Sequence, residues 1–134
     1  MESSELIELA KAAREFACAE ISGFKVGAAL LTKSGKVFLG CNIEDPSGIG
    51  VTNICAERCA IIKALSEGYK DFKAIAVVGG ADELESCTPC GACRQYLHSF
   101  CPQATIICLD SESNVKEFKL PELLPYSFNE TFTV

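Results

Sequence analysis

Residues 86–95 read SCTPCGACRQ and place Cys87, Cys90 and Cys93 at intervals of three. The apolar run AIAVVGG (74–80) precedes this stretch, and the segment PCGACRQYLHSF (89–100) has the pattern of a helix. Short apolar runs are typical of buried strands, and proline is common in the first turn of a helix. We therefore expect a strand-to-helix junction, with Pro89 in the first helical turn. Cys90 and Cys93 then share one face of that turn, and Cys87 lies before it.

Further helices and strands are expected on both sides of this junction in the sequence. Hydrophobic periodicity and turn residues predict α and β segments in alternation. The alternation indicates an α/β fold with three α/β/α layers around one mixed five-stranded sheet, in a single domain over residues 1–134. The expected segments are a helix over 4–20 capped by serine, a hairpin of strands 24–31 and 36–41, a helix over 54–68 ended by Gly68, a strand at 74–80, the helix over 89–100, a strand at 104–110, an edge strand at 115–120 and a short helical turn at 121–125.

Composition narrows the setting in which the protein works. Nine cysteines form an odd set, and the N-terminal segment is acidic and amphipathic, unlike a signal peptide, so we expect a reducing cytoplasm. We expect no membrane contact, because no apolar run is long enough to span a bilayer. The net charge of −6 argues against a nucleic-acid polymer as partner, since binding one depends on neutralising phosphates. A small neutral or cationic ligand fits better.

A further cysteine, Cys55, completes a candidate metal site with Cys90 and Cys93. Cys55 lies near the start of the helix that precedes the strand at 74–80, and Glu57 follows it by two residues. The two helix N-termini point to the same edge of the sheet, where the helix dipole favours the thiolate form that binds metal. Cys55, Cys90 and Cys93 can therefore hold one Zn²⁺, with the fourth tetrahedral position open, as in catalytic zinc sites.

The charge of such a site requires compensation. Three thiolates around Zn²⁺ leave an excess negative charge, which weakens the pull of the metal on water. Arg58 and Arg94 follow metal ligands closely, and hydrogen bonds from their guanidinium groups to thiolate sulfur offset this charge. Plain solvation at the surface is the alternative for both arginines.

The motifs CAER and PCGACRQ together resemble the signature of zinc-dependent nucleoside deaminases. GFKVGAALLTKSGKVFLGCNIE, CAERCAIIKALSEG and ELLPYSF follow in the order and spacing of the small all-cysteine cytidine deaminases, over about residues 5–128. The resemblance implies a cytidine deaminase-like fold and the hydrolysis of cytidine and 2′-deoxycytidine to uridine and 2′-deoxyuridine, in pyrimidine salvage. It also implies that Glu57 is the acid/base that moves protons between water and the pyrimidine.

The resemblance also implies which residues bind the nucleoside. Asn42 and Glu44 match the residues that bind the sugar hydroxyl, and Phe24 matches the aromatic wall beside the base. The backbone N–H of Ala56 and the carbonyl of Thr88 match the groups that bind O2 and the amino group of the ring.

Family members are homotetramers with shared active sites, so a homotetramer is implied here, and Phe128 resembles a residue lent to a neighbour. The segment 45–54 is about two residues longer than usual, and Ile21 stands where a tyrosine is common. Both departures leave the range of substrates and the subunit contacts open.

Several alternatives stay open. Cys87 can serve as a fourth ligand of a structural zinc or of an iron–sulfur cluster, and a redox Cys-x-x-Cys is a further alternative. The substrate can be another aminopyrimidine nucleoside such as blasticidin S, and a zinc-stabilised binding module without catalysis is a remote possibility. His98 fits surface or packing better than metal binding. The cysteines expected to be small buried hydrophobic residues are Cys18, Cys41, Cys59, Cys101 and Cys108.

Overall fold

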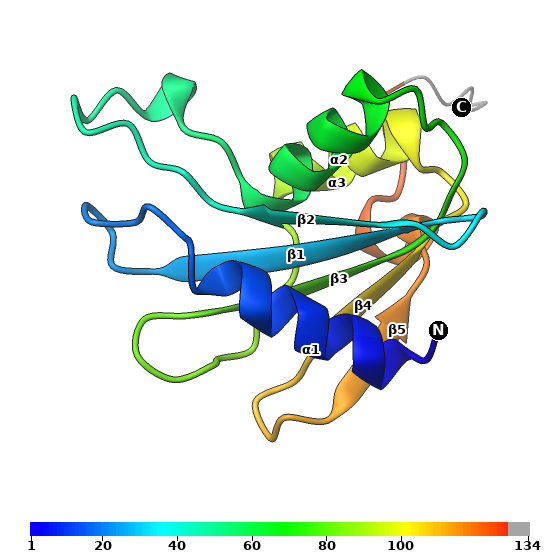
Figure 1. Ribbon diagram of the computed structural model, residues 1–134, viewed down its shortest axis with the longest axis horizontal. Coiled ribbons are helices and arrows are strands. Elements are labelled where there is room, and N and C mark those ends of the chain that lie inside the picture. The colour runs from blue at the N-terminus through cyan, green and yellow to red at the C-terminus, as the bar shows by residue number, and fades with distance from the viewer. Residues whose placement is uncertain (129–134) are drawn as a thin grey trace.

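The structure is a computed structural model that describes residues 1–128. Within that range the chain forms short helices and strands in alternation (Figure 1). Their bounds are α1 (Ser3–Arg14), β1 (Lys25–Thr32), β2 (Val37–Cys41), the 3₁₀ helix η1 (Gly50–Thr52), α2 (Ala56–Ser66), β3 (Phe72–Gly80), α3 (Gly91–Phe100), β4 (Thr105–Leu109), β5 (Val115–Phe118) and α4 (Leu120–Leu123).

The five strands form one mixed sheet in the order β2-β1-β3-β4-β5. Neighbouring strands are antiparallel except for β3 and β4, which are parallel. Helix α1 covers one face of the sheet, and α2 and α3 cover the other (Figure 1). These observations confirm the expected three-layer α/β/α fold, and β5 lies at an edge as expected.

The alternation of side chains along the strands divides the core into two clusters. In β1, Ala28 and Leu30 belong to the cluster beneath α2 and α3, whereas Ala29 and Leu31 belong to the cluster beneath α1. Successive residues of a strand point to opposite faces, so a strand with apolar residues at every position is buried on both sides. The sheet therefore packs against helices on both of its faces, with one hydrophobic cluster on each.

The first helix differs from the expectation at both ends. Its N-cap is Glu2 rather than a serine, and the Glu2 N–H donates to the Glu5 carboxylate at 3.3 Å. It ends at Arg14 rather than at residue 20, because the following segment pairs with the chain beyond β2. The N–H of Cys18 donates to the carbonyl of Asn42, and the N–H of Glu44 donates to the carbonyl of Cys18. These bonds support the start of the polar loop 45–54.

A glycine in β2 fixes the position of α2. A Cβ atom at Gly40 would lie 2.4 Å from the carbonyl oxygen of Ala56 and 2.6 Å from the nitrogen of Ala60. Because glycine has no Cβ, the α2 backbone rests directly on the strand. The first turn of α2, which carries Glu57, is thereby held at the end of the sheet.

Candidate active site

Two of the three expected zinc ligands occupy equivalent positions at the ends of two helices. Cys55 is the N-cap of α2 and Cys90 is the N-cap of α3, both with extended backbone. Pro89 therefore precedes the N-cap and does not lie in the first helical turn, contrary to the expectation. The helix begins at Gly91, two residues later than expected, because the carbonyl of Cys90 accepts the first helical hydrogen bond, from the N–H of Arg94 at 2.8 Å.

The sulfur atoms of Cys55, Cys90 and Cys93 all lie within 4.8 Å of one another. The first is half-buried, the second exposed and the third buried. Three sulfur donors converging at helix N-termini fit the thiolate set that zinc prefers. Among the described residues, no other group of three or more such side chains meets so closely, and Cys87 is not part of this one.

Arg58 donates from Nη2 to the sulfur of Cys55 at 3.4 Å, as expected, and also to the carbonyl of Asn53 at 3.3 Å. A hydrogen bond from Cys93 is the largest influence on Cys55, and together with Arg58 it lowers the pKa of that thiol to about 5. The same bond raises the pKa of Cys93. Cys55 is therefore the thiol that most readily becomes a thiolate.

The structure corrects the expectation for Arg94. Its guanidinium nitrogens donate to oxygen atoms: the carbonyl of Pro89 at 2.7 Å, the carbonyl of Leu123 at 2.8 Å and the hydroxyl of Thr88 at 3.0 Å. The side chain points back across the segment before α3 because carbonyl groups there have no helical donor. Arg94 thus ties the segment 88–89 to the end of α4 instead of neutralising a thiolate.

Glu57 is almost completely buried, with 4% of its surface exposed. Burial, together with the nearby charge of Cys55 and against an opposing backbone hydrogen bond, raises the pKa of its carboxyl group to about 7. A carboxyl group with this pKa can both accept and release a proton near neutral pH, which suits a general acid and base.

A cavity of about 200 Å³ brings most of the predicted site residues together. Its walls come from the start of β1, the end of β2, the first turn of α2 and the segment before α3. Glu44 and Phe128 are absent from its lining. The lining residues are Phe24, Val26, Asn42, Cys55, Ala56, Glu57, Cys87, Thr88 and Cys90.

Asn42 holds the cavity wall in place. Its Oδ1 accepts from the N–H of Val26 at 2.8 Å, and its Nδ2 donates to the carbonyl of Phe24 at 2.8 Å. Glu44 lines another cavity, of about 570 Å³, together with Ile21. Its carboxylate accepts from the N–H groups of Ile21 and Ser22, and hydrogen bonds from Ser22 lower its pKa.

Phe128 lies at the end of the described chain, with 81% of its surface exposed. Its N–H donates to Oε1 of Gln95 in α3 at 3.0 Å. The structure therefore does not bring the Phe128 ring into the cavity of its own chain. Gln95 was missed by the sequence analysis, although it lies in the quoted PCGACRQ motif.

Cys87 lines the cavity, which the sequence did not predict, and Gly79 lies close to two of the lining side chains. A Cβ atom at Gly79 would lie 2.9 Å from the sulfur of Cys87 and 2.9 Å from Cε1 of Phe24. Burial raises the pKa of Cys87 to about 11, so this thiol stays protonated at neutral pH. The double glycine at 79–80 was the available signal, because glycine often marks a close approach.

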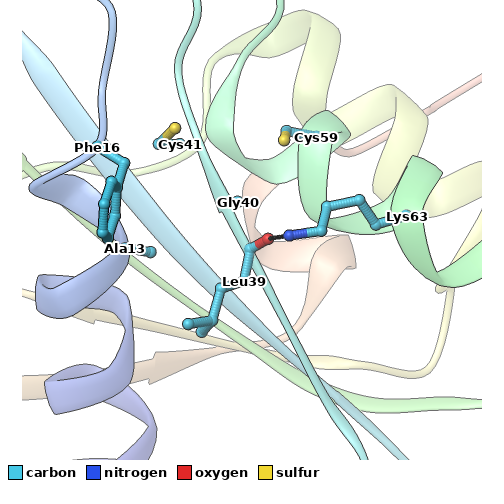
Figure 2. Close-up of a pocket in the computed structure, with 7 residues that line it drawn as sticks. All are labelled: Ala13, Phe16, Leu39, Gly40, Cys41, Cys59 and Lys63. Atoms are coloured by element: carbon cyan, nitrogen blue, oxygen red, sulfur yellow. Dashed lines mark hydrogen bonds between the residues drawn. The ribbon is translucent and has the colours of Figure 1, made fainter.

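A third cavity, of about 290 Å³, lies between α1, β2 and α2 and contains none of the expected site residues (Figure 2). Cys41 and Cys59 line it and are half-buried, and Cys18 is exposed. These three cysteines correct the expectation of burial, because they sit around the edge strand β2. Cys101 and Cys108 are buried as expected. His98 is half-buried in α3 and does not belong to the cysteine group.

Comparison with known proteins agrees with the geometry of the cavity. A family model described as the cytidine and deoxycytidylate deaminase zinc-binding region matches residues 1–109. A cytidine deaminase of Halalkalibacterium halodurans is 48% identical over 129 residues, covering 96% of this chain and 95% of the relative. A blasticidin-S deaminase of Bacillus cereus is 32% identical over 77% of this chain and 76% of its own.

The structural comparison gives a similar result. The 1.6 Å crystal structure of a cytidine deaminase from Burkholderia pseudomallei superposes with a TM-score of 0.86. The two sequences are 45% identical, and the match covers 96% of this chain and all of that chain. No helix among residues 1–128 is both long and apolar enough to cross a membrane.

Proposed function

The chain belongs to the cytidine and deoxycytidylate deaminase family, and on this premise we propose that it hydrolyses cytidine and 2′-deoxycytidine to uridine and 2′-deoxyuridine. Each turnover consumes one water and releases one ammonia. The observation that carries this proposal is the convergence of three sulfur atoms beside the buried carboxyl group of Glu57.

Cys55, Cys90 and Cys93 are the residues that would hold one zinc ion. When bound, zinc supplies a Lewis acid that acidifies water at neutral pH. Arg58 supports this role, because its hydrogen bond favours the charged form of Cys55. Arg94 acts differently, by holding the segment that carries Thr88.

Glu57 carries the protons in this proposal. Its carboxylate accepts a proton from the attacking water and delivers it to N3 of the pyrimidine. It then takes the proton of the new hydroxyl group on C4 and passes it to the amine, so that the C4 carbonyl forms and ammonia leaves. The pKa of about 7 supports this cycle, because the carboxyl group can then both accept and release a proton near neutral pH. The cavity wall formed by Phe24 and Asn42 would exclude bulk water from the ring.

The nucleoside would be bound mostly by backbone and aromatic groups. The N–H of Ala56 belongs to the first turn of α2, where N–H groups lack helical acceptors, so it can donate to O2 of the ring. The carbonyl of Thr88 would accept from the amino group, and Phe24 would pack beside the base. Asn42, from the wall of this cavity, and Glu44, from the cavity that Ile21 also lines, would bind the sugar hydroxyl.

We also propose the setting of the enzyme: a single catalytic domain in a cytoplasmic homotetramer with shared active sites, serving pyrimidine salvage. Two features support it. The described cysteines are free, as in a reducing compartment. Phe128 is exposed and does not line the cavity of its own chain, so a second copy can receive its ring.

The test is the ultraviolet change on adding cytidine to the purified protein, beside a matched sample stripped of zinc. Metal-dependent conversion to uridine is the expected result. Conversion of blasticidin S but not of cytidine would move the substrate to another aminopyrimidine nucleoside. One tightly held zinc per chain with no turnover on either substrate would indicate a site closed by a fourth protein ligand, and a binding module instead of an enzyme.

A further inference from the structure

The segment after α4 holds its last described residues in a fixed and unusual conformation. Tyr126 has a φ of 53°, in the left-handed region that side chains rarely adopt. Ser127 next to it is buried, with 6% of its surface exposed, whereas Phe128 is 81% exposed. The chain therefore turns so that one residue anchors the segment and the next directs its ring outward.

Gln95 binds this turn through both ends of its side-chain amide. Its Oε1 accepts from the N–H of Phe128 at 3.0 Å, and its Nε2 donates toward the carbonyl of Phe128 at 3.5 Å. Gln95 follows Cys93 by two residues in α3, and the adjacent Arg94 donates to the carbonyl of Leu123 at 2.8 Å. Two consecutive side chains of the helix that carries Cys93 therefore fix the C-terminal segment at two points.

We infer that Gln95 is a positioning residue, whose amide directs the Phe128 ring into the nucleoside cavity of a second copy of the chain. The inference rests on the proposed function with shared sites. Fixing the backbone of a residue whose ring stays in solvent brings no gain in binding free energy. A ring that inserts into a partner binds more tightly when its backbone is already ordered, because less conformational entropy is lost on binding. The cavity has Phe24 on one wall, which offers an aromatic partner for a base and a second ring.

The inference is tested by replacing Gln95 with leucine, an apolar residue of comparable size that removes both hydrogen bonds. Gln103→Leu makes the same change on the exposed segment after α3 and serves as the control. We expect Gln95→Leu to raise KM for cytidine about 2- to 12-fold, the range for one lost hydrogen bond, with kcat and zinc content close to those of the parent. Gln103→Leu should leave KM unchanged.

A double-mutant cycle tells whether Gln95 acts through Phe128. Phe128→Ala should raise KM, and adding Gln95→Leu to it should raise KM no further. Full additivity of the two changes, or an unchanged KM in Gln95→Leu, would overturn the inference.

Fluorescence gives a readout that is independent of turnover. The chain contains no tryptophan, so Phe128→Trp introduces a fluorophore that reports on this position alone. In the assembled protein its emission should be blue-shifted and should change on adding uridine, and Gln95→Leu should move both signals toward those of an exposed indole. An indole that is exposed in the assembled protein would overturn the inference even if the enzyme is active. Failure to deaminate cytidine in the parent would instead reject the proposed function.

Discussion

The ability of Glu57 to exchange a proton near neutral pH depends on its burial, because a glutamate at the surface would stay ionised. Glu57→Gln keeps the shape of the side chain and removes its ability to carry a proton. We expect kcat for cytidine to fall about 10²- to 10⁴-fold while zinc content stays at the parent level. Glu112→Gln, on an exposed turn, is the matched control and should keep full activity. Activity close to that of the parent in Glu57→Gln would exclude the proton-transfer role.

The raised pKa of Glu57 also predicts how stability depends on pH. Because its pKa rises from 4.5 to about 7 on folding, the folded state binds this proton more tightly than the unfolded chain does. The resulting stabilisation is complete below about pH 4.5 and is lost as the pH rises through about 7.

Glu57→Gln removes this dependence. The variant should match the parent in free energy of unfolding near pH 4.5 and exceed it near pH 8, by up to about 3 kcal/mol. Urea titrations at both pH values and matched zinc measure the difference, and Glu112→Gln should show none. A difference that stays constant with pH would contradict the raised pKa.

The two arginines that look equivalent in the sequence should respond differently to the same substitution. Arg58→Met removes the donor to the Cys55 sulfur, so zinc affinity should fall about 10- to 100-fold. Arg94→Met removes bonds to Thr88 and to the Pro89 carbonyl, so KM for cytidine should rise while zinc is retained. Chelator competition and steady-state kinetics separate the two effects. Equal zinc loss in both variants would show that the contacts of Arg94 also support the metal.

At the residue scale, the sequence was a good guide where spacing determines geometry. The positions of Cys55, Cys90 and Cys93 predicted sulfurs that the structure brings within 4.8 Å. The sequence was a poor guide where a long side chain chooses among nearby acceptors, as for Arg94, whose partners come from a distant part of the chain.

At the element scale, the contact between β2 and α2 depends on Gly40. Gly40→Ala would place a methyl group 2.4 Å from the Ala56 carbonyl, so we expect it to destabilise the fold by about 1–3 kcal/mol. The displacement would reach the first turn of α2 and lower activity as well. Gly50→Ala is the control, because a Cβ there meets no atom within 4 Å, and its effect on the free energy of urea unfolding should be close to zero. Equal stability of the two variants would contradict the close packing.

Element types were predicted better than element ends. The amphipathic pattern continues past Arg14, but α1 stops there because Cys18 pairs with the chain beyond β2, a long-range contact that local periodicity does not encode. The start of α3 was misplaced for a related reason. Pro89 suits a first helical turn, but it is buried just before Cys90, which becomes the N-cap.

At the scale of the whole molecule, charge predicts which substrates are excluded. With a net charge of −6, the protein should not hold a polyanionic strand. We expect free cytidine to be deaminated while cytosines within a single-stranded oligonucleotide remain intact, at low salt where electrostatic attraction would be strongest. Sequencing of the treated oligonucleotide measures this, with the same oligonucleotide digested to nucleosides as the positive control. Conversion within the intact strand would show that charge does not limit access.

The overall layering followed from the order of helices and strands, because alternating segments must bury both faces of a sheet. The strand order β2-β1-β3-β4-β5 did not follow, since it depends on which edges meet after the chain collapses. The sequence also did not predict the exposure of Phe128, because this depends on the turn at Tyr126 and on the hydrogen bond to Gln95 in α3.

The placement of the three sulfurs on two helix ends also bears on how the chain is made. During translation Cys55 emerges from the ribosome before Cys93. Strand β4, the parallel partner of β3, begins at Thr105 and emerges after both. A metal ion that joins the two helix ends closes a loop around α2 and β3, which reduces the conformational freedom of the nascent polypeptide before the sheet is complete. We therefore expect zinc supplied during translation to give a higher yield of folded protein than the same zinc supplied afterwards.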